Sequence, residues 1–359
     1  MHHPLRNLTE RILAIDVGAG TQDILLFDPD REPENCEKLV LPSRTQAVGR
    51  EIRAATAAGN AIHLTGPLMG GGASSDAVAA HLRASLPVSA TPSAAKTMHN
   101  ALDRVTAMGV EVRDTPPAGA KIIRTGDIDL PGLAAALEPL GVLLPTTVAV
   151  AVQDHGYLPG SGNNDVRLDY LRGLLRNGGD LATAVFHRGF QPPPEPMTRM
   201  QAILSAAPDA WIMDTGAAAV LGALDDPAVA AAANEGVILV NCGNMHTFAT
   251  LVRGRRMYGL FEHHTGGMTT DLVQRLISEL QSGTLDTDGF RASFDGHGAA
   301  LDPAYADLAP FRFVTITGPN RRIARPLGFH EAAPHGDMML AGSWGLVRGI
   351  QLVRDRTSC

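Results

Sequence analysis

The chain has 359 residues, of which 45% are hydrophobic and 19% are charged, so it can bury a large core and is not disordered. Its length exceeds the roughly 250–300 residues at which a single core stops growing, which predicts two domains. A formal net charge of −7 argues against a general nucleic-acid binder, because such proteins carry a basic surplus.

The cysteines and the apolar runs bound the class of protein further. Cys36, Cys242 and Cys359 are scattered and form no CxxC pair, which excludes a disulfide framework and a self-contained zinc or iron–sulfur motif. No apolar run reaches the roughly 20 residues that a membrane helix needs. We therefore expect a soluble cytoplasmic protein with neither membrane nor nucleic acid as a partner.

The N-terminal segment predicts a buried hairpin. Apolar residues at 11–16 and 22–27 flank a glycine pair, a pattern typical of two strands joined by a tight turn. The elements expected next are a strand near 37–41, a helix over 45–58, a strand over 60–65, a glycine-rich loop over 66–75 and a helix over 75–85. The predicted order is β-β-β-α-β-α.

The same order recurs near the C-terminus. Shifting the chain by 225 residues places Ile12–Gly18 on Val237–Gly243. The elements expected after this second copy are strands near 246–252 and 256–262, a helix over 267–281, a strand over 312–317 and a helix over 337–353. Two such halves indicate a duplicated domain with a cleft between the copies; the alternative is a chance likeness of two common hairpins.

The middle of the chain, residues 92–209, contains the proline and glycine clusters. Its apolar segment Val148–Val152 needs burial and precedes a helical stretch at 165–176, so we interpret this part as an inserted α/β subdomain and not a linker. The predicted division is a first lobe at 1–91, the insertion at 92–209 and a second lobe at 210–359.

Both glycine turns are candidate phosphate sites. In the first turn, Asp16 is followed by Gly18, Gly20 and Thr21; backbone N–H groups can approach a phosphate closely where no β-carbon obstructs them. A carboxylate at the end of a strand can also hold a hydrated Mg²⁺. Taken alone, this turn can equally be a plain hairpin. The second turn contains Asn241, Gly243, Asn244, His246 and Thr247, and two facing turns could hold an oligophosphate from both sides.

The two turns resemble the phosphate-1 and phosphate-2 hairpins of the actin-like ATPase superfamily, which includes actin, sugar kinases and heat-shock chaperones. Three further segments are similar to parts of that superfamily. Residues 210–223 resemble the strand and small-residue helix that precede phosphate-2, and residues 264–271 resemble the loop that follows phosphate-2. Residues 340–345 resemble the small-residue contact of the closing helix. Residues 313–320 are similar to its adenosine segment, although Pro319 stands where the superfamily has its second glycine.

The resemblance implies a two-lobed, duplicated ribonuclease-H-like α/β architecture with an inserted α/β subdomain, and a site for ATP and Mg²⁺. Under it, the metal would be held by Asp16 and Asn241, the phosphates by Gly18, Gly20, Thr21, Gly243, Asn244 and Thr247, and the base or ribose would lie near Gly318 and Asn320. Asp214 would orient water or a substrate hydroxyl.

One departure concerns Asn241, because phosphate-2 usually carries an aspartate. An amide brings no charge and should hold Mg²⁺ less firmly, which suggests tight binding of the nucleotide with slow or absent hydrolysis.

The turn 16–23 and the segment Gln153–Gly156 are similar to a group of this superfamily labelled pyruvate formate-lyase activating enzyme. Radical chemistry on an iron–sulfur cluster needs three closely spaced cysteines, which this chain lacks, so we do not expect that activity.

Asp154 and His155 follow the predicted strand at 146–152, where ligands of open α/β sheets bind. They are candidate catalytic residues that together would act as a general base toward a phosphoryl acceptor. The alternative is that Asp154 caps a turn and His155 is merely exposed. Glu262, His263 and His264 follow one another along a strand, where adjacent residues face opposite sides, and this disfavours a metal site there.

The expected function is ATP–Mg binding, with slow ATPase or phosphotransferase activity. The alternative is an ATP-gated or non-catalytic activator of a protein partner.

Overall fold

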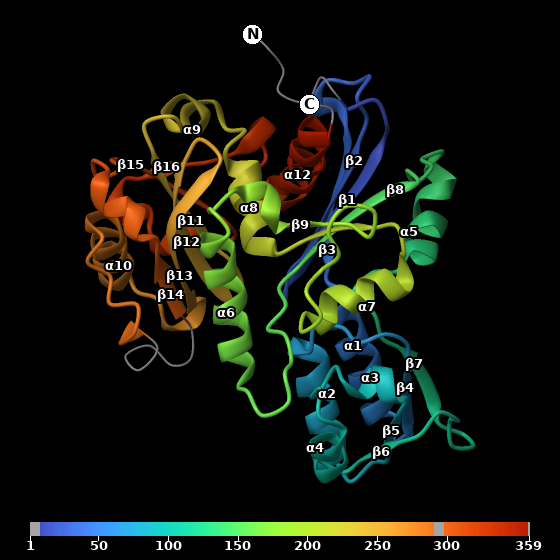
Figure 1. Cartoon of the computed structure of the whole chain (residues 1–359). Coiled ribbons are helices and arrows are strands. Elements are labelled where there is room, and N and C mark those ends of the chain that lie inside the picture. Colours follow the sequence, from blue (N-terminus) through green and yellow to red (C-terminus); the bar gives the residue numbers. More distant parts are fainter. Residues whose placement is uncertain (1–7, 291–297, 358–359) are drawn as a thin grey trace.

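The computed structural model describes residues 8–290 and 298–357, which form three β-sheets with helices on their faces (Figure 1). The first sheet has the order β3-β2-β1-β8-β10-β9. Its strands are β1 (Ile12–Val17), β2 (Thr21–Phe27), β3 (Glu37–Pro42), β8 (Thr147–Val152), β9 (Val185–Phe186) and β10 (Trp211–Met213). The hairpin expected from the N-terminal pattern is thus present, with β1 antiparallel to β2 and parallel to β8.

Alternation along β1 explains why this sheet is covered on both faces. Ile12 and Ala14 belong to the core that lies between the two large sheets, whereas Leu13 and Ile15 belong to a second core on the opposite face. Two helices contribute to that outer core, α5 (Leu130–Leu137) and α7 (Thr198–Ala206).

The second sheet repeats the pairing of the first. Its order is β14-β13-β12-β11-β15-β16, and β11 is antiparallel to β12 and parallel to β15, as β1 is to β2 and β8. The strands are β11 (Val237–Cys242), β12 (His246–Arg253), β13 (Arg256–His264), β14 (Gly298–Leu301), β15 (Phe313–Thr317) and β16 (His330–Glu331). This shared strand order confirms the predicted two-lobed, duplicated α/β fold.

Two helices lie between the large sheets, α8 (Thr215–Ala223) and α12 (Ala341–Thr357) (Figure 1). Helix α10 (Thr270–Ser282) covers the outer face of the second sheet through Val273, Leu276, Ile277 and Leu280. The remaining helices of the lobes are α6 (Asn163–Arg176) and α9 (Pro227–Ala232). No helix in the described ranges is long and apolar enough to cross a membrane.

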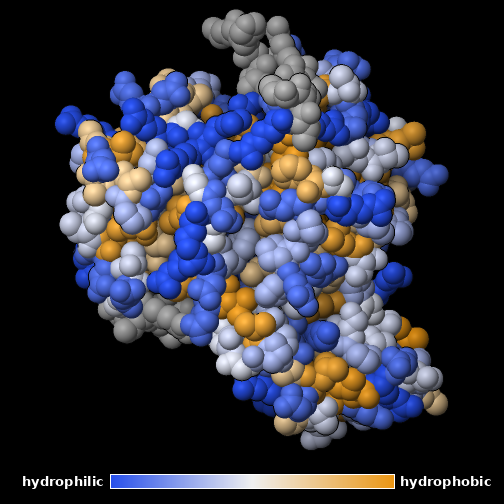
Figure 2. All heavy atoms as spheres, viewed as in Figure 1, coloured by the Kyte–Doolittle hydropathy of each residue, from blue (hydrophilic) through white to orange (hydrophobic). Residues whose placement is uncertain are grey.

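The third sheet is smaller and fully parallel, with the order β6-β5-β4-β7. Its strands are β4 (Ile62–Thr65), β5 (Val88–Ala90), β6 (Val110–Val112) and β7 (Lys121–Arg124), and its helices are α1 (Arg44–Ala57), α2 (Gly72–Arg83), α3 (Pro92–Ala95) and α4 (Leu102–Ala107). We call residues 44–124 the small unit; it projects from one end of the two-lobed body (Figures 1 and 2).

The sheets do not follow the predicted division into 1–91, 92–209 and 210–359. The strand expected at 60–65 is present as β4, but it belongs to the small unit, and β8 pairs with β1. β10, placed in the second lobe by sequence, also pairs in the first sheet. We propose that the insertion is the small unit, since strand pairing and not position in the chain defines each lobe.

Candidate functional site

The two glycine bends close in the same way and touch each other. In the first, the Gly18 N–H donates to the Thr21 carbonyl at 2.9 Å; in the second, the Gly243 N–H donates to the His246 carbonyl at 2.9 Å. A β-carbon on Gly20 would lie 2.7 Å from Nδ2 of Asn244. The first bend therefore needs glycine at position 20 because the second bend approaches it so closely.

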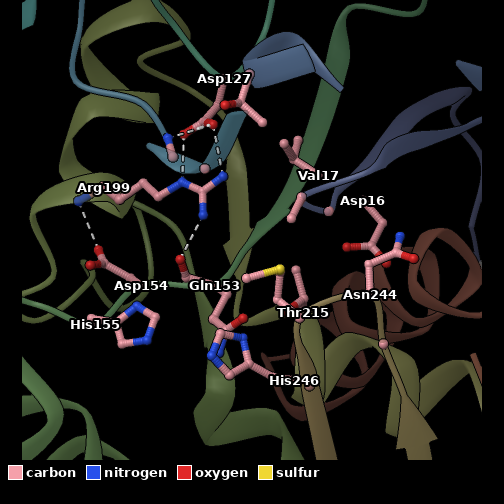
Figure 3. A pocket seen from close by; sticks show the side chains of 18 of the residues that line it. Asp16, Val17, Asp127, Gln153, Asp154, His155, Arg199, Thr215, Asn244 and His246 are labelled. Atoms are coloured by element: carbon pink, nitrogen blue, oxygen red, sulfur yellow. Dashed lines mark hydrogen bonds and ion pairs between the residues drawn. The ribbon is translucent and has the colours of Figure 1, made fainter. Parts of the chain in front are cut away.

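A cavity of about 490 Å³ opens beside these bends (Figure 3). Both lobes and the small unit line it. Of the residues expected at a site, Asp16, Gly18, Thr21, Asp154, His155, Asn241, Gly243, Asn244 and Gly318 form part of its wall. The small unit contributes two stretches, 68–72 and 96–100, so the three parts of the fold converge on one space.

Asp16 is a carboxylate that lacks a partner. Its Oδ1 atom is buried and has no hydrogen bond from any described residue, while a β-carbon on Gly342 would lie 1.9 Å from its Oδ2 atom. Burial, with the nearby charges of Asp23 and Asp214, raises the pKa of Asp16 well above its ordinary value. A cation at this point would satisfy the orphaned oxygen, which is the chemistry that a Mg²⁺ site requires.

The second bend is supported from behind by Asn320. Its Nδ2 donates to the Gly243 carbonyl at 2.9 Å and its backbone N–H donates to the Cys242 carbonyl at 2.9 Å. Thr247 is buried, and its hydroxyl contacts that of Thr265 at 3.1 Å. Neither Asn320 nor Thr247 lines the cavity, so each shapes the bend from outside the ligand space.

Asp214 lies behind the cavity wall and is already engaged. Its Oδ1 accepts the Gly216 N–H at 3.0 Å and caps α8, and Arg167 of α6 donates to Oδ2 at 2.6 Å and to Oδ1 at 3.2 Å. The same guanidinium donates to both oxygens of Glu262 at 2.8 Å. The role expected for Asp214, orienting water or a hydroxyl, finds no support in this placement, because Arg167 and the helix occupy both of its oxygens.

The Arg167 ion pairs are buried on all sides. The side chains of Arg167, Asp214 and Glu262 are 4%, 1% and 3% exposed. Burial opposes ionisation of Glu262, but the charge and the hydrogen bonds of Arg167 outweigh it and lower the pKa of Glu262 to about 2. Since Asp214 directly follows β10 and Glu262 lies on β13, this single arginine connects the two lobes.

Asp154 is a helix cap and not a partner positioned for catalysis. Its Oδ2 accepts the backbone N–H groups of Arg199 and Met200 at 2.7 and 2.9 Å, and its Oδ1 accepts that of Gly156 at 2.8 Å. The geometry thus favours the turn-capping alternative for Asp154. His155 lines the cavity, its ring lies 5.4 Å from that of His246, and its catalytic role stays a prediction (Figure 3).

Sequence reasoning missed Arg199 and Asp127. Arg199 of α7 donates to both Asp127 oxygens at 2.7 and 2.8 Å and to the Gln153 carbonyl at 2.7 Å (Figure 3). Asp127 also accepts the Gly70 N–H, so the pair connects the glycine loop of the small unit to the first lobe. No local pattern marks either residue, since 72 positions separate them.

Residues 69–323 match the family model described as "Putative pyruvate format-lyase activating enzyme (DUF1786)". The chain belongs to the DUF1786 family. Radical chemistry on an iron–sulfur cluster does not fit its residues: Cys36 precedes β3 of the first sheet, Cys242 ends β11 of the second, and both are buried. The described residues contain no group of three or more His, Cys, Asp or Glu side chains arranged for a metal ion. Cys359 lies outside them.

Solved structures resemble the chain in fold. They include the PilM–PilN type IV pilus biogenesis complex (12% identity, TM-score 0.40, 96% of this chain and 99% of that chain). EutJ, an ethanolamine utilization protein from Carboxydothermus hydrogenoformans, has 10% identity and a TM-score of 0.31 over 96% and 91% of the two chains. A ROK family glucokinase from Streptomyces griseus, solved with glucose and AMPPNP, has 11% identity and a TM-score of 0.32 over 96% and 99%.

These TM-scores are low, and the fold assignment rests on the duplicated strand order instead. Among curated proteins, no sequence matches this chain.

Proposed function

We propose that this protein binds ATP with Mg²⁺ between its two lobes and retains the nucleotide without rapid hydrolysis. The observation that carries the proposal is the contact between the two bends, in which Gly20 meets Asn244 beside one cavity. The N–H groups of Gly18 and Gly243 close their own bends. The other backbone N–H groups of the two bends would meet one ligand from two sides, which suits a chain of phosphates.

Asp16 and Asn241 are the residues that would hold the metal. Each is the next-to-last residue of a central strand of its sheet, and each lines the cavity. Asp16 would accept hydrogen bonds from the hydration shell of Mg²⁺ or bind the ion directly, and the amide oxygen of Asn241 would do so without adding charge. The metal would neutralise phosphate charge when bound.

Slow hydrolysis follows from two residues. Asn241 brings no negative charge to the second bend, and the carboxylate of Asp214 is occupied by Arg167 and by the N-terminus of α8. Phosphoryl transfer depends on positioning and charge stabilisation, and neither residue is placed to activate a water. Retention of nucleotide suits a protein that changes its contacts with a partner when ATP binds.

Thermal unfolding tests the binding proposal. ATP–Mg at about 100 times its Kd should stabilise the folded chain by about 2.7 kcal/mol. We expect the melting temperature to rise with ATP–Mg, and to rise much less when EDTA removes the metal or when Asp16→Asn removes its carboxylate. The matched control is Asp169→Asn on the exposed face of α6, which should respond as the wild type does. An unchanged melting temperature at millimolar ATP–Mg would overturn the proposal.

A phosphotransferase is the second candidate, and the extent of the cavity favours it. Beyond the bends, the wall continues along 68–72 and 96–100 of the small unit and includes His155. That part has room for an acceptor next to the nucleotide. Consumption of ATP only after a particular metabolite is added would select this function over simple retention.

A further inference from the structure

Three imidazoles meet on the cavity wall. The ring centroids of His155 and His246 are 5.4 Å apart, and those of His246 and His264 are 5.0 Å apart. All three side chains line the cavity. In Figure 3, His155 and His246 lie side by side, on the other side of the view from Asp16. The cluster is therefore separate from the carboxylate that suits the metal.

The cluster is assembled from both lobes. His246 is the first residue of β12, and His264, the last residue of β13, is its partner in the strand register. His155 follows β8 of the first lobe. The carbonyl of His246 accepts the Gly243 N–H that closes the second bend, so the bend itself positions this imidazole next to the expected phosphate-binding amides.

Two acidic side chains near the imidazoles, Glu262 and Asp154, accept hydrogen bonds from other groups. Glu262 lies on the same face of β13 as His264, and its oxygens accept hydrogen bonds from Arg167 and from Gln153 Nε2 at 3.0 Å. Asp154 directs both oxygens to backbone N–H groups. Glu262 also interacts electrostatically with His246 and His155. The imidazole N–H groups on the cavity wall are donors suited to phosphate oxygens.

We infer that His155, His246 and His264 bind the terminal phosphate of the nucleotide and make the pocket select a triphosphate over a diphosphate. The inference rests on the proposed nucleotide site and specifies which part of the ligand these residues recognise. It also bears on Asn241: where the second bend brings no charge of its own, imidazole N–H donors would serve the last phosphate.

Calorimetric titration with ATP–Mg and ADP–Mg tests this. In the wild type we expect ATP–Mg to bind at least about tenfold more tightly than ADP–Mg, since a charge-assisted hydrogen bond is worth about that much in affinity. His246→Gln replaces the rigid imidazole by a flexible amide, which loses more rotamer freedom when it donates to the same phosphate oxygen. It should weaken ATP–Mg binding about tenfold and change ADP–Mg binding less than twofold. His264→Gln should act in the same direction.

The control is His187→Gln, which changes a histidine that stacks on Trp211 and does not line the cavity. Its ratio of ATP to ADP affinity should equal that of the wild type. If His246→Gln does not fold, as judged by unliganded melting, His264→Gln and His155→Gln provide the same comparison. Wild-type protein that binds neither nucleotide would overturn the proposed function. Tight ATP binding with an unchanged ratio in the imidazole variants would overturn this inference alone.

Discussion

Asp16 and Asp23 face each other as register partners across the first hairpin, and both line the cavity. Asp23 is only 8% exposed, and its Oδ1 has no hydrogen bond from the described residues. Burial raises the pKa of Asp23 to about 7, against the hydrogen bond from Thr21 and with a smaller contribution from Asp337. The folded chain therefore binds this proton more tightly than the unfolded chain, whose carboxyl has the ordinary value of 3.8.

This difference predicts how stability depends on pH. The contribution of the Asp23 carboxyl is fully present below about pH 4 and is lost as pH rises through about 7. Without metal or nucleotide, the wild type should lose free energy of unfolding between pH 4 and 8, and Asp23→Asn should remove up to about 4 kcal/mol of that loss. Urea unfolding across this range measures it, with Asp30→Asn at an exposed position as the control. Equal slopes for wild type and Asp23→Asn would contradict the prediction.

At the scale of elements, the contact between α8 and α12 depends on glycine. A β-carbon on Gly222 would lie 1.7 Å from the Ala341 carbonyl oxygen, and one on Gly345 would lie 1.7 Å from that of Ala218. The two helices therefore touch backbone to backbone between the large sheets. The same contact places Gly342 against Asp16, so helix packing also shapes the proposed metal site.

Adding one methyl group at this contact should separate the helices. We expect Gly222→Ala and Gly345→Ala each to destabilise the protein by at least about 2–3 kcal/mol, because both neighbours are backbone and cannot turn aside. Gly173→Ala in α6 is the matched control, since its β-carbon would meet no described atom within 4 Å. It should be neutral or stabilise by up to about 1 kcal/mol. Equal melting temperatures for Gly222→Ala and Gly173→Ala would show that the contact is looser than described.

At the scale of the molecule, Arg167 and the paired bends hold the lobes together. Arg167 connects the end of β10 in one lobe to β13 in the other, and Asn244 rests on Gly20. A buried ion pair adds little net stability when it forms, but removal of one partner leaves uncompensated charge. The lobes are thus coupled most strongly where the proposed nucleotide would bind.

Removing Arg167 should therefore open the molecule. Arg167→Met leaves Asp214 and Glu262 buried without their cation, and we expect it to destabilise the chain by about 3–5 kcal/mol. Small-angle X-ray scattering should give a larger radius of gyration for this variant than for the wild type, with contraction when ATP–Mg is added. Arg172→Met on the same helix, where the ion pair is largely exposed, should change neither property. An unchanged radius in Arg167→Met would show that other contacts hold the lobes.

Much of the candidate site was predictable from short segments. The two bends and Asp16 were predicted from local patterns, because apolar alternation indicates the buried face of a strand and a glycine pair after a strand indicates a bend. The small-residue contact at 340–345 was predicted from the resemblance to the actin-like superfamily. The assigned role of Asp214 found no support for a different reason. Its partner Arg167 is 47 residues away, and nothing near Asp214 in the chain indicates that its oxygens are occupied.

The chain's own pattern is enough to establish two copies of a hairpin and the glycine bends, because each depends on residues close together in the chain. Which strand completes each sheet is settled by the folded molecule alone. Pairing of β1 with β8 joins residues more than a hundred positions apart. Such pairing depends on how whole surfaces fit together, and no local pattern encodes it. The same holds for the contact between His155 and His246, which come from different lobes.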